Sequence, residues 1–506
     1  MVDTIVAGLK SFWERRPLVA ILLIALLPRL ASTVWSKGYA MHDDHFGPIE
    51  QPFIIMHYPE YWTTRTTPHG HSIVYPTIHY ALFNGLEAVG IEDPQTTMYV
   101  VRLLHALYSL LVVYFGFKIA ELLGGLDAAR KVGLILALLW ALPFLSVRNL
   151  IEVICIPPLM AGSWFILKSG RPGRNAFIAG ACFAMAFVFR YQTLAFTGTL
   201  GAILLFTRRF RDLGWLTAGF LVAALVVQGS ADTFAWGYPF ASFVEYVRYN
   251  ASHPEDYTNG PWYNYLLLVL GVLIPPLSFF LLYGFIRNWR KTLLLTLPVV
   301  VFFVVHSSFP NKQERFIVPV VPLIVVLSVV GWEEYVRQSS FWLRHRTGLK
   351  AVWVWFWSVN VALLILFSTY YCKKTRVESM YWLYGKQVTA LFQNGGKDGI
   401  SQPPFFYGGK YPVLMADISS TQQLEYIKSQ FAVSPVRPNY ILFYGTDNYD
   451  ERTHAIESTL GLRMELEKRF DPSFLDYVFY RLNPTHNKNE TIFVFHAIYP
   501  GNQQVQ

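Results

Sequence analysis

The sequence predicts a polytopic α-helical membrane protein with about eleven transmembrane helices and a small α/β domain near its C-terminal end. Of its 506 residues, 53% are hydrophobic and only 15% are charged, whereas soluble proteins carry about 25% charged residues. Apolar runs of roughly 20 residues recur, and each is long enough to cross a ~30 Å hydrocarbon core. After residue 371 the composition becomes polar, which indicates a soluble domain.

A series of apolar segments makes up the predicted membrane part. The first, at residues 18–35, follows a basic stretch and ends without the small-residue site at which signal peptides are cleaved, so it is expected to remain as an anchor. The later segments lie near residues 97–118, 131–147, 150–168, 175–191, 193–207, 213–231, 263–286, 291–307, 315–333 and 349–371.

Short clusters of Lys and Arg predict the orientation of these segments. They lie at Lys10/Arg15/Arg16, Lys118/Arg130/Lys131, Lys168/Arg171/Arg174, Arg208/Arg209/Arg211, Arg287/Arg290/Lys291 and Arg337/Arg344/Arg346/Lys350. Cytoplasmic loops retain Lys and Arg, which places the N-terminus in the cytoplasm and the C-terminal domain outside. The long loops, 37–95 and 232–262, then face outside, and function is expected there because loops carry functional residues. Scattered in this way, the net charge of +9 does not indicate nucleic-acid binding.

Residues 372–506 are predicted to form an extracytoplasmic accessory domain of the α/β class. Helical patterns near 422–431 and 451–460 alternate with short apolar runs, which favours a partly parallel sheet. The runs expected to be strands are 405–407, 413–415, 440–444, 477–480 and 492–495. The segment carries no glycine-rich phosphate loop, so it is interpreted as accessory.

Two adjacent carboxylates, Asp43 and Asp44, follow the first apolar segment and are expected at a membrane surface. One interpretation is a solvated acidic turn at a helix end. The other is a general base, because two close carboxylates cannot both ionise freely and one pKa rises. A base whose pKa approaches the working pH is the more effective catalyst.

Arg29 and Arg102 lie inside or at the edge of apolar segments, where a charge costs a few kcal/mol. Each side chain either snorkels to the interface or binds a lipid phosphate, which a guanidinium group matches in a bidentate way. The histidines of the first loop lack the spacing of a metal pair, so no metal site is predicted, and a divalent metal stays an open alternative. The three cysteines are too widely spaced to indicate a disulfide framework.

Seven short motifs follow one another within residues 18–335: Asp43–Glu50, His71–Pro76, Val101–Leu107, Arg148–Glu152, Phe189–Thr193, Asp232–Tyr265 and Asn311–Phe316. In this order they resemble glycosyltransferase family 22, the GT-C-fold mannosyltransferases that use a polyprenyl- or dolichyl-phosphate-linked sugar. The chain departs from the family pattern at three positions. Asp44 stands where the family has Glu, Asn311 where it has His, and Gln313 where it has Glu.

The resemblance implies an inverting GT-C glycosyltransferase whose catalytic membrane domain spans residues 1–371. It would transfer a sugar, mannose or a similar hexose, from a polyprenyl- or dolichyl-phosphate donor to a hydroxyl of a glycan or glycolipid on the extracytoplasmic face. Membrane lipid is the expected surrounding, in a bacterial inner membrane or an endoplasmic-reticulum membrane. The soluble tail has no counterpart in the eukaryotic members, which favours a bacterial relative.

The same resemblance assigns roles to individual residues. Asp43 is at the position of the catalytic base, and Asp44 would tune it or hold the acceptor. The residues expected to bind substrate are Glu50, Arg65, His71, Arg102, Lys312 and Arg315. Among them, Lys312 and Arg315 would clamp the departing lipid phosphate, with Arg102 in reserve. Glu50 would tune the base or hold the acceptor, and the Arg65 and His71 side chains would line the sugar pocket.

A transporter or flippase of lipid-linked sugars is the competing class. It would need polar residues spread through the helical bundle, whereas this chain concentrates them in loops on one predicted side. The sequence also lacks an evident internal repeat, on which many transporter folds are built. A scaffold protein with a sensing C-terminal domain is a third alternative. Sugar transfer in detergent separates the enzyme from both.

Overall fold

The computed structural model describes residues 2–60, 67–252, 259–485, 487–488 and 490–500. They form two compact units. The first, called here the helical unit, comprises Met1–Trp35, Glu60–His79 and Val101–Thr369. The second, the α/β unit, comprises Ser36–Pro59, Tyr80–Val100 and Tyr370–Gln506. The boundary predicted at residue 371 lies next to the break between Thr369 and Tyr370, and two earlier stretches of the chain also belong to the second unit.

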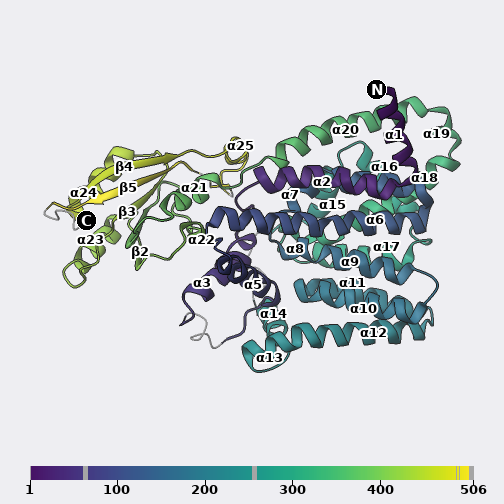
Figure 1. The fold of residues 1–506 in the computed structure, drawn as a ribbon, viewed down its shortest axis with the longest axis horizontal. Helices are drawn as coiled ribbons and strands as arrows, with labels where there is room; N and C mark the ends of the chain where they lie inside the picture. Colours follow the sequence, from purple (N-terminus) through teal and green to yellow (C-terminus); the bar gives the residue numbers. More distant parts are fainter. Residues whose placement is uncertain (1, 61–66, 253–258, 486, 489, 501–506) are drawn as a thin grey trace. The chain divides into compact units, whose positions relative to one another are not determined.

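The helical unit is built from packed helices (Figure 1). They are α1 (Val2–Arg15), α2 (Pro17–Trp35), α6 (Pro94–Leu138), α7 (Ala141–Leu145), α8 (Ile151–Ile154), α9 (Ile156–Leu167), α10 (Pro172–Phe189), α11 (Leu194–Phe206), α12 (Phe210–Ala224), α13 (Ser230–Trp236), α14 (Ala241–Ser252), α15 (Asn264–Val272), α16 (Leu277–Arg287), α17 (Leu293–Ser308), α18 (Val321–Gln338), α19 (Ser340–Arg344) and α20 (Arg346–Ser368). Short irregular turns η3 (Tyr191–Thr193), η4 (Leu225–Gly229) and η5 (Glu314–Val320) connect some of them. Helix α6 and helix α5 (Val74–Ala88) contribute residues to both units.

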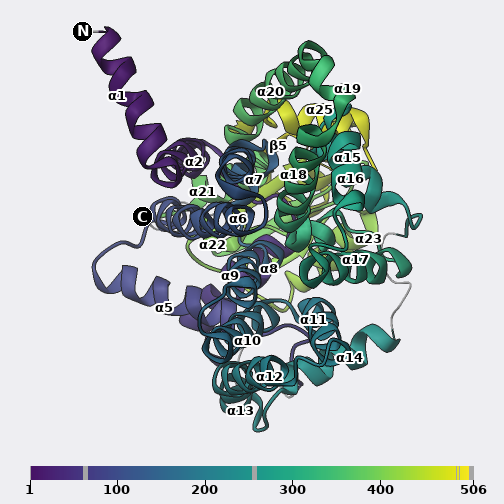
Figure 2. The same ribbon diagram turned by 90° about the vertical axis from the view of Figure 1, so that its right-hand side faces the viewer.

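Small residues let neighbouring helices approach closely. Helices α10 and α12 run side by side (Figures 1 and 2), and a Cβ at Gly180 or Gly219 would clash with the backbone of the other helix. The same holds between α16 and α18, where Gly284 faces Gly331. Such contacts are typical of membrane helices, whose association depends on close packing because lipid is as apolar as the side chains.

Six helices among the described residues are long and apolar enough to cross a membrane, or seven if the bent pair α15 and α16 forms one span. Three more predicted spans correspond to shorter apolar helices at 151–167, 191–206 and 293–308. The span predicted at 97–118 lies within α6, whose backbone leaves helical geometry at Gly125 with φ 76°, and the span predicted at 131–147 covers the end of α6 and all of α7. The protein is thus a multi-pass membrane protein, and the count of eleven spans stays a prediction.

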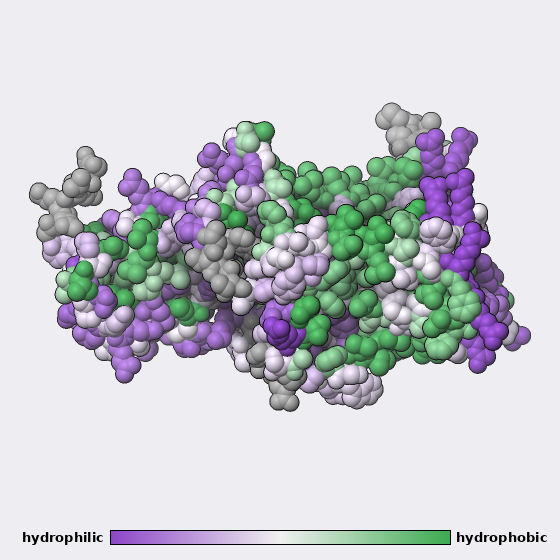
Figure 3. All heavy atoms as spheres, turned by 90° about the horizontal axis from the view of Figure 1, so that it is seen from below, coloured by the Kyte–Doolittle hydropathy of each residue, from purple (hydrophilic) through white to green (hydrophobic). Residues whose placement is uncertain are grey.

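The surface of the helical unit agrees with this assignment. Large apolar side chains stand exposed on it, including Leu27, Phe206 and Phe234. Figure 3 shows apolar surface spread over the helices and a hydrophilic band at one end of the unit. Exposed apolar patches of this extent are expected where lipid covers the protein.

The α/β unit contains one five-stranded sheet of order β2-β1-β3-β5-β4. Its strands are β1 (Ala390–Asn394), β2 (Leu414–Asp417), β3 (Tyr440–Tyr444), β4 (Arg463–Phe470) and β5 (Ile492–Ile498). Strands β2, β1 and β3 are parallel, and β5 pairs antiparallel with β3 and β4. Phe392, Ile441 and Phe495 are among the buried residues of its core. The expected partly parallel sheet is therefore present.

Helices and turns complete the α/β unit. From the C-terminal part come α21 (Lys374–Leu383), α22 (Phe405–Gly408), α23 (Thr421–Gln430), α24 (Tyr449–Leu460) and α25 (Phe474–Leu482). From the first loop come the turns η1 (His42–Asp44) and η2 (Phe46–Glu50) and helix α3 (Gln51–His57). The strand predictions at 405–407 and 477–480 are wrong, because these runs form helices α22 and α25. Helix α25 is capped by the Ser473 hydroxyl, which accepts a hydrogen bond from Asp476 N.

Candidate active site

The first loop places its two carboxylates in different surroundings. Both belong to turn η1, where Asp43 is exposed and Asp44 is only 1% exposed. The Ala40 N–H donates a 2.8 Å hydrogen bond to Oδ2 of Asp44. Asp44 therefore closes the turn from Ala40, whereas the Asp43 side chain is exposed on the same turn.

Glu50 is engaged by protein donors. It is 2% exposed, and its Oε1 accepts from Phe406 N at 2.8 Å while its Oε2 accepts from the Tyr411 hydroxyl at 2.9 Å. His45 Nε2 lies 3.0 Å from the same Oε1, and the His45 ring stacks on Tyr407 with centroids 5.4 Å apart. Glu50 thus fastens the first loop to the segment around α22, and its position fits a supporting role more closely than direct contact with an acceptor.

The segment that follows α20 also binds the first loop within the α/β unit. Gly38 forms an isolated parallel bridge with Cys372, and Cys372 N donates to Lys37 O at 3.1 Å. The Lys373 ammonium donates to Ala40 O at 3.1 Å and lies 4.5 Å from the centroid of the Tyr39 ring. The loop that carries the carboxylates is therefore held from the C-terminal side of the chain.

A second cluster of charges lies inside the helical unit. Glu152 on α8 and Arg190 at the end of α10 form an ion pair in which each side chain is 1% exposed. Arg315 Nε lies 3.6 Å from the same Glu152 oxygen. One carboxylate thus faces two guanidinium groups, and this excess of positive charge suits an anionic ligand.

Neighbouring groups fix the orientation of Arg315. Its Nε and Nη2 both donate to the side-chain oxygen of Gln313, at 2.9 and 2.6 Å. The carbonyl of Gln313 accepts in turn from the Tyr265 hydroxyl at 3.2 Å. The Phe316 ring lies 5.1 Å from the Arg190 guanidinium and 5.5 Å from that of Arg315. Gln313, which stands where a Glu was expected, is neutral and so adds no negative charge beside Arg315.

Lys312 belongs to the same end of the helical unit. It is buried, and its ammonium donates to the carbonyls of His306, at 3.3 Å, and Phe309. It also lies 5.7 Å from the centroid of the Tyr265 ring. Because Tyr265 contacts both Lys312 and Gln313, the two predicted clamp residues and Arg190 form one cationic group, called here the Arg190–Arg315 cluster (Glu152, Arg190, Lys312, Gln313 and Arg315).

The buried arginines of the first two long helices are engaged by protein groups. Arg29 donates to Ser109 Oγ at 2.8 Å and to the carbonyls of Ala25, Leu136 and Ala137. These carbonyls include the last ones of α6, which explains how a charge is accommodated inside an apolar segment. Arg102 is also buried, and its Nε donates to Thr33 O at 2.9 Å. Arg102 thus bridges to α2, which gives it a packing role beside the expected reserve role in phosphate binding.

Of the two residues predicted to line the sugar pocket, His71 and Arg65, the structure describes only His71. His71 is exposed at the start of the segment that leads into α5. The next residue is buried, and the Ser72 hydroxyl donates to Gln228 Oε1 at 2.6 Å, which fixes this segment against η4. Arg65 lies outside the described residues.

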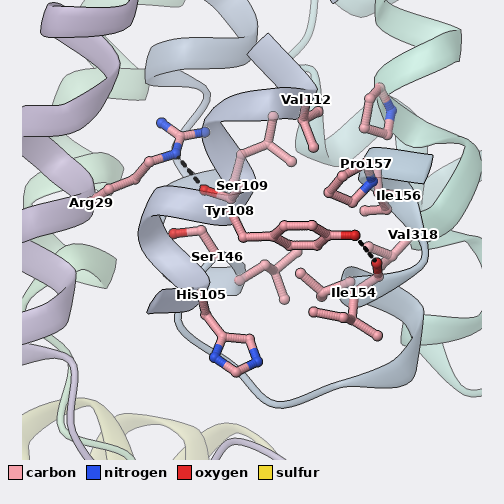
Figure 4. Close-up of a pocket in the computed structure, with 14 residues that line it drawn as sticks. Arg29, His105, Tyr108, Ser109, Val112, Ser146, Ile154, Ile156, Pro157 and Val318 are labelled. Atoms are coloured by element: carbon pink, nitrogen blue, oxygen red, sulfur yellow. Dashed lines mark hydrogen bonds between the residues drawn. The ribbon is translucent and has the colours of Figure 1, made fainter. Parts of the chain in front are cut away.

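An apolar pocket opens within the helical unit close to the cationic cluster. Arg29 of α2 and His105, Tyr108, Ser109 and Val112 of α6 form one side, and residues of α7 to α9, η5 and α18 form the rest (Figure 4). The Tyr108 hydroxyl donates to Ile154 O at 3.3 Å across it. Val153 of the lining directly follows Glu152 of the Arg190–Arg315 cluster in the chain.

Two residues of this site, Glu152 and Arg190, were not among those predicted to bind substrate. The signal was present, because both are charged residues next to apolar segments, the criterion that singled out Arg29 and Arg102. Within the described part of the chain, no three His, Cys, Asp or Glu side chains gather as metal ligands.

Known proteins resemble this chain over part of its length. Alpha-1,2-mannosyltransferase ALG9 of Mus musculus is 33% identical over 129 residues, which cover 22% of this chain and 20% of that protein. GPI mannosyltransferase 3 of Saccharomyces cerevisiae is 32% identical over 138 residues, 24% of this chain and 22% of that protein. GPI alpha-1,2-mannosyltransferase 3 of Homo sapiens is 20% identical over 317 residues, 61% of this chain and 56% of that protein. These matches thus span a fifth to about half of the length of each relative.

Solved structures of GT-C enzymes show the same fold. Apo ArnT from Cupriavidus metallidurans superposes with a TM-score of 0.63 at 15% identity, covering 94% of this chain and 97% of that one. ArnT bound to undecaprenyl phosphate gives a TM-score of 0.56. The oligosaccharyltransferase AglB from Archaeoglobus fulgidus gives 0.50 at 10% identity, covering 89% of this chain and 72% of that one. The expected GT-C fold is therefore confirmed.

The family resemblance is confirmed by a match that covers more of the chain than those of the three relatives named above. The model of the Alg9-like mannosyltransferase family matches residues 20–394, which include every motif named above. Because the match extends over well more than half of the chain, the protein belongs to the Alg9-like mannosyltransferase family.

Proposed function

We propose that this protein transfers mannose, with inversion, from a polyprenyl-phosphate-linked donor to a hydroxyl of a glycan or glycolipid on the extracytoplasmic face of a membrane. The observation that carries the proposal is the Arg190–Arg315 cluster, in which one buried carboxylate faces two guanidinium groups. It lies within the matched family region. A donor of this class leaves as a lipid phosphate that gains one negative charge, and such a cluster is suited to bind it.

The reaction requires a base and a phosphate clamp. Asp43 takes the proton from the acceptor hydroxyl, whose oxygen forms a bond to the anomeric carbon while the bond from that carbon to the phosphate oxygen breaks. Arg315, Lys312 and Arg190 stabilise the charge that develops on the departing phosphate. Stabilisation of this kind is commonly the largest single term in catalysis. Asp44 and Glu50 support the loop that carries the base, and His71 contacts the sugar.

The apolar pocket, with a volume of about 30 Å³, is too small to enclose an isoprenoid chain, and we propose only that the apolar side chains around it offer a surface for one. The lining of the pocket is predominantly apolar and includes Val153, next to Glu152 in the chain, so a phosphate held at the cluster would have apolar surface beside it for the adjoining isoprenoid. ArnT, which has the same fold, was solved with undecaprenyl phosphate, and we propose a ligand of that class here.

Transfer of labelled mannose in detergent tests this function. Wild-type protein with a polyprenyl-phosphate mannose donor and a lipid-extracted acceptor pool should form labelled product, and Asp43→Asn should form about 10²–10⁴-fold less. A transporter or flippase would form no labelled product, because it only moves its substrate across a membrane, and detergent solution contains no sealed membrane to cross. Asp417→Asn is the matched control, since Asp417 lies at the end of β2, away from the first loop in sequence. Equal transfer by wild type and Asp43→Asn would rule out Asp43 as the base.

A further inference from the structure

Lys373 occupies an unusual position at the start of α21. Its backbone has φ 48° and ψ 44°, the left-handed region that a residue with a side chain adopts only at a cost. Asp476 of α25, which is fully buried, holds this conformation, because its carboxylate accepts from Lys373 N and Lys374 N, both at 3.2 Å. The Tyr370 hydroxyl donates to the same carboxylate at 2.6 Å. The contacts with Asp476 thus keep the backbone of Lys373 in the left-handed region and fix the direction of its side chain.

The side chain of Lys373 is directed at the first loop. Its ammonium donates to Ala40 O at 3.1 Å and lies over the Tyr39 ring. Ala40 is also the residue whose N–H binds Asp44 Oδ2 at 2.8 Å. Ala40 is therefore held at both of its backbone polar groups, its carbonyl by Lys373 and its N–H by Asp44. The turn that carries Asp43 is closed between these two contacts.

The charges around Lys373 come from several elements. Asp44 of η1 and Asp476 of α25 are negative, Arg376 of α21 is positive, and the Cys372 thiol is adjacent. Burial lowers the pKa of the Lys373 ammonium to about 8, Arg376 lowers it as well, and Asp44, Cys372 and Asp476 act in the opposite direction. The ammonium is thus present below about pH 8 and is lost above it. With the proton gone, the cationic neighbour of Asp44 disappears.

We infer that Lys373 is a positioning residue for the proposed transfer, which holds the turn from Tyr39 to Asp44 and balances the Asp44 carboxylate so that Asp43 is presented to the acceptor. The inference rests on the proposed function and extends it, because it gives the C-terminal segment, expected to be accessory, a direct part in shaping the site. Lys373 does not touch the reacting atoms. It acts through the backbone of Ala40.

The test compares Lys373→Met, Lys373→Arg and the neighbouring control Lys374→Met in the detergent transfer assay across pH 6 to 10. Lys374 takes part in the contacts described for this segment through its backbone N–H, so its side-chain replacement should leave transfer near the wild-type rate. Lys373→Met should lower kcat by about 10²-fold, the loss expected when a catalytic group is misplaced by about 1 Å. The KM for the lipid donor should stay unchanged, because the donor phosphate is assigned to other residues.

The pH profile separates positioning from a general structural role. Wild-type transfer should decline above about pH 8. Lys373→Arg should retain transfer and move this decline upward, because a guanidinium group keeps its proton. Should Lys373→Met fail to fold, as judged by thermal unfolding in detergent, the Lys373→Arg profile decides alone. An alkaline decline that is unchanged in Lys373→Arg, or transfer by folded Lys373→Met within about threefold of wild type, overturns the inference. Absence of transfer by the wild type overturns the proposed function itself and the inference with it.

Discussion

Glu152 and Arg190 form an ion pair that is almost completely removed from solvent, with each side chain 1% exposed. Arg315 approaches the same carboxylate to 3.6 Å. Removing one partner of a buried pair leaves the other charge uncompensated and costs about 3–5 kcal/mol. The three side chains are therefore expected to determine stability as well as ligand binding.

Glu152→Gln should lower the thermal unfolding temperature in detergent, because Arg190 and Arg315 then face each other without their shared anion. Added polyprenyl phosphate should restore part of the loss, since its phosphate supplies the missing negative charge. Glu245→Gln is the control. It removes the acidic partner of an exposed pair with Arg248 on α14, which should contribute about 0–1 kcal/mol. An equal effect of the two substitutions would contradict the central role of Glu152.

Arg315→Ala and Lys312→Ala should each raise the KM for the lipid-linked donor and lower kcat by about 10²–10³-fold. Each substitution removes a positively charged group that stabilises the departing phosphate. Arg315→Lys should recover little, since the planar guanidinium contacts Gln313 through two nitrogens. Arg248→Ala serves as the matched cation control, because Arg248 is largely exposed. If the KM for the lipid-linked donor and kcat are the same in all variants as in the wild type, Arg315 and Lys312 do not bind the departing phosphate.

Asp44→Asn should reduce transfer less than Asp43→Asn does. The amide oxygen of Asn can still accept the hydrogen bond from Ala40 N, so the turn keeps its shape while the negative charge is removed. Because Asp43 is the exposed member of the pair and Asp44 the buried one, only Asp43 is expected to receive a proton from the acceptor. Steady-state transfer by the two variants checks this, and a reversed order would identify Asp44 as the base.

The sequence predicts the membrane class and the family because both depend on features that are local in the chain. Apolar runs and motif order are read directly, and several helices, such as α2, α18 and α20, follow the predicted spans to within several residues, whereas α6 and the bent pair α15 and α16 do not. The helix–strand assignment of short apolar runs failed at 405–407 and 477–480, since a run of three or four apolar residues fits a helix or a strand equally well. The charged edge strand β4 (Arg463–Phe470) was missed, because most of its residues are exposed and no apolar run marks it.

The partners within the candidate site could not be predicted. Glu152 and Arg190 are 38 residues apart, and Lys373 lies 333 residues beyond Ala40. Each contact depends on how the helices or the sheet pack, which no local pattern specifies. The rule that a charge within an apolar segment needs a partner was available for Arg190 as it was for Arg29, but it does not name the partner.

Glu50 and Tyr411 should be energetically coupled. The Tyr411 hydroxyl donates to Glu50 Oε2 at 2.9 Å, and Phe406 N donates to Oε1. Glu50→Gln and Tyr411→Phe should each destabilise the α/β unit by about 1–3 kcal/mol, because a buried polar group loses its partner. The double variant should lose less than the sum, with an interaction free energy of about 0.5–3 kcal/mol. Additive losses in a thermal-unfolding double-mutant cycle would show that the contact does not fasten the first loop.

Glu490, which precedes β5, should make the stability of the α/β unit depend on pH. Burial raises its pKa to about 7, helped by a hydrogen bond with Asp398 and by the Asp447 charge, while Arg452 lowers it. Between about pH 4.5 and pH 7 the unfolded chain therefore loses this proton while the folded protein keeps it. Stability contributed by the group is thus greatest at the acidic end and falls as the pH rises toward 7. Glu490→Gln should flatten this part of the unfolding-temperature profile relative to wild type. Parallel profiles of the two proteins would show that the proton is not retained on folding.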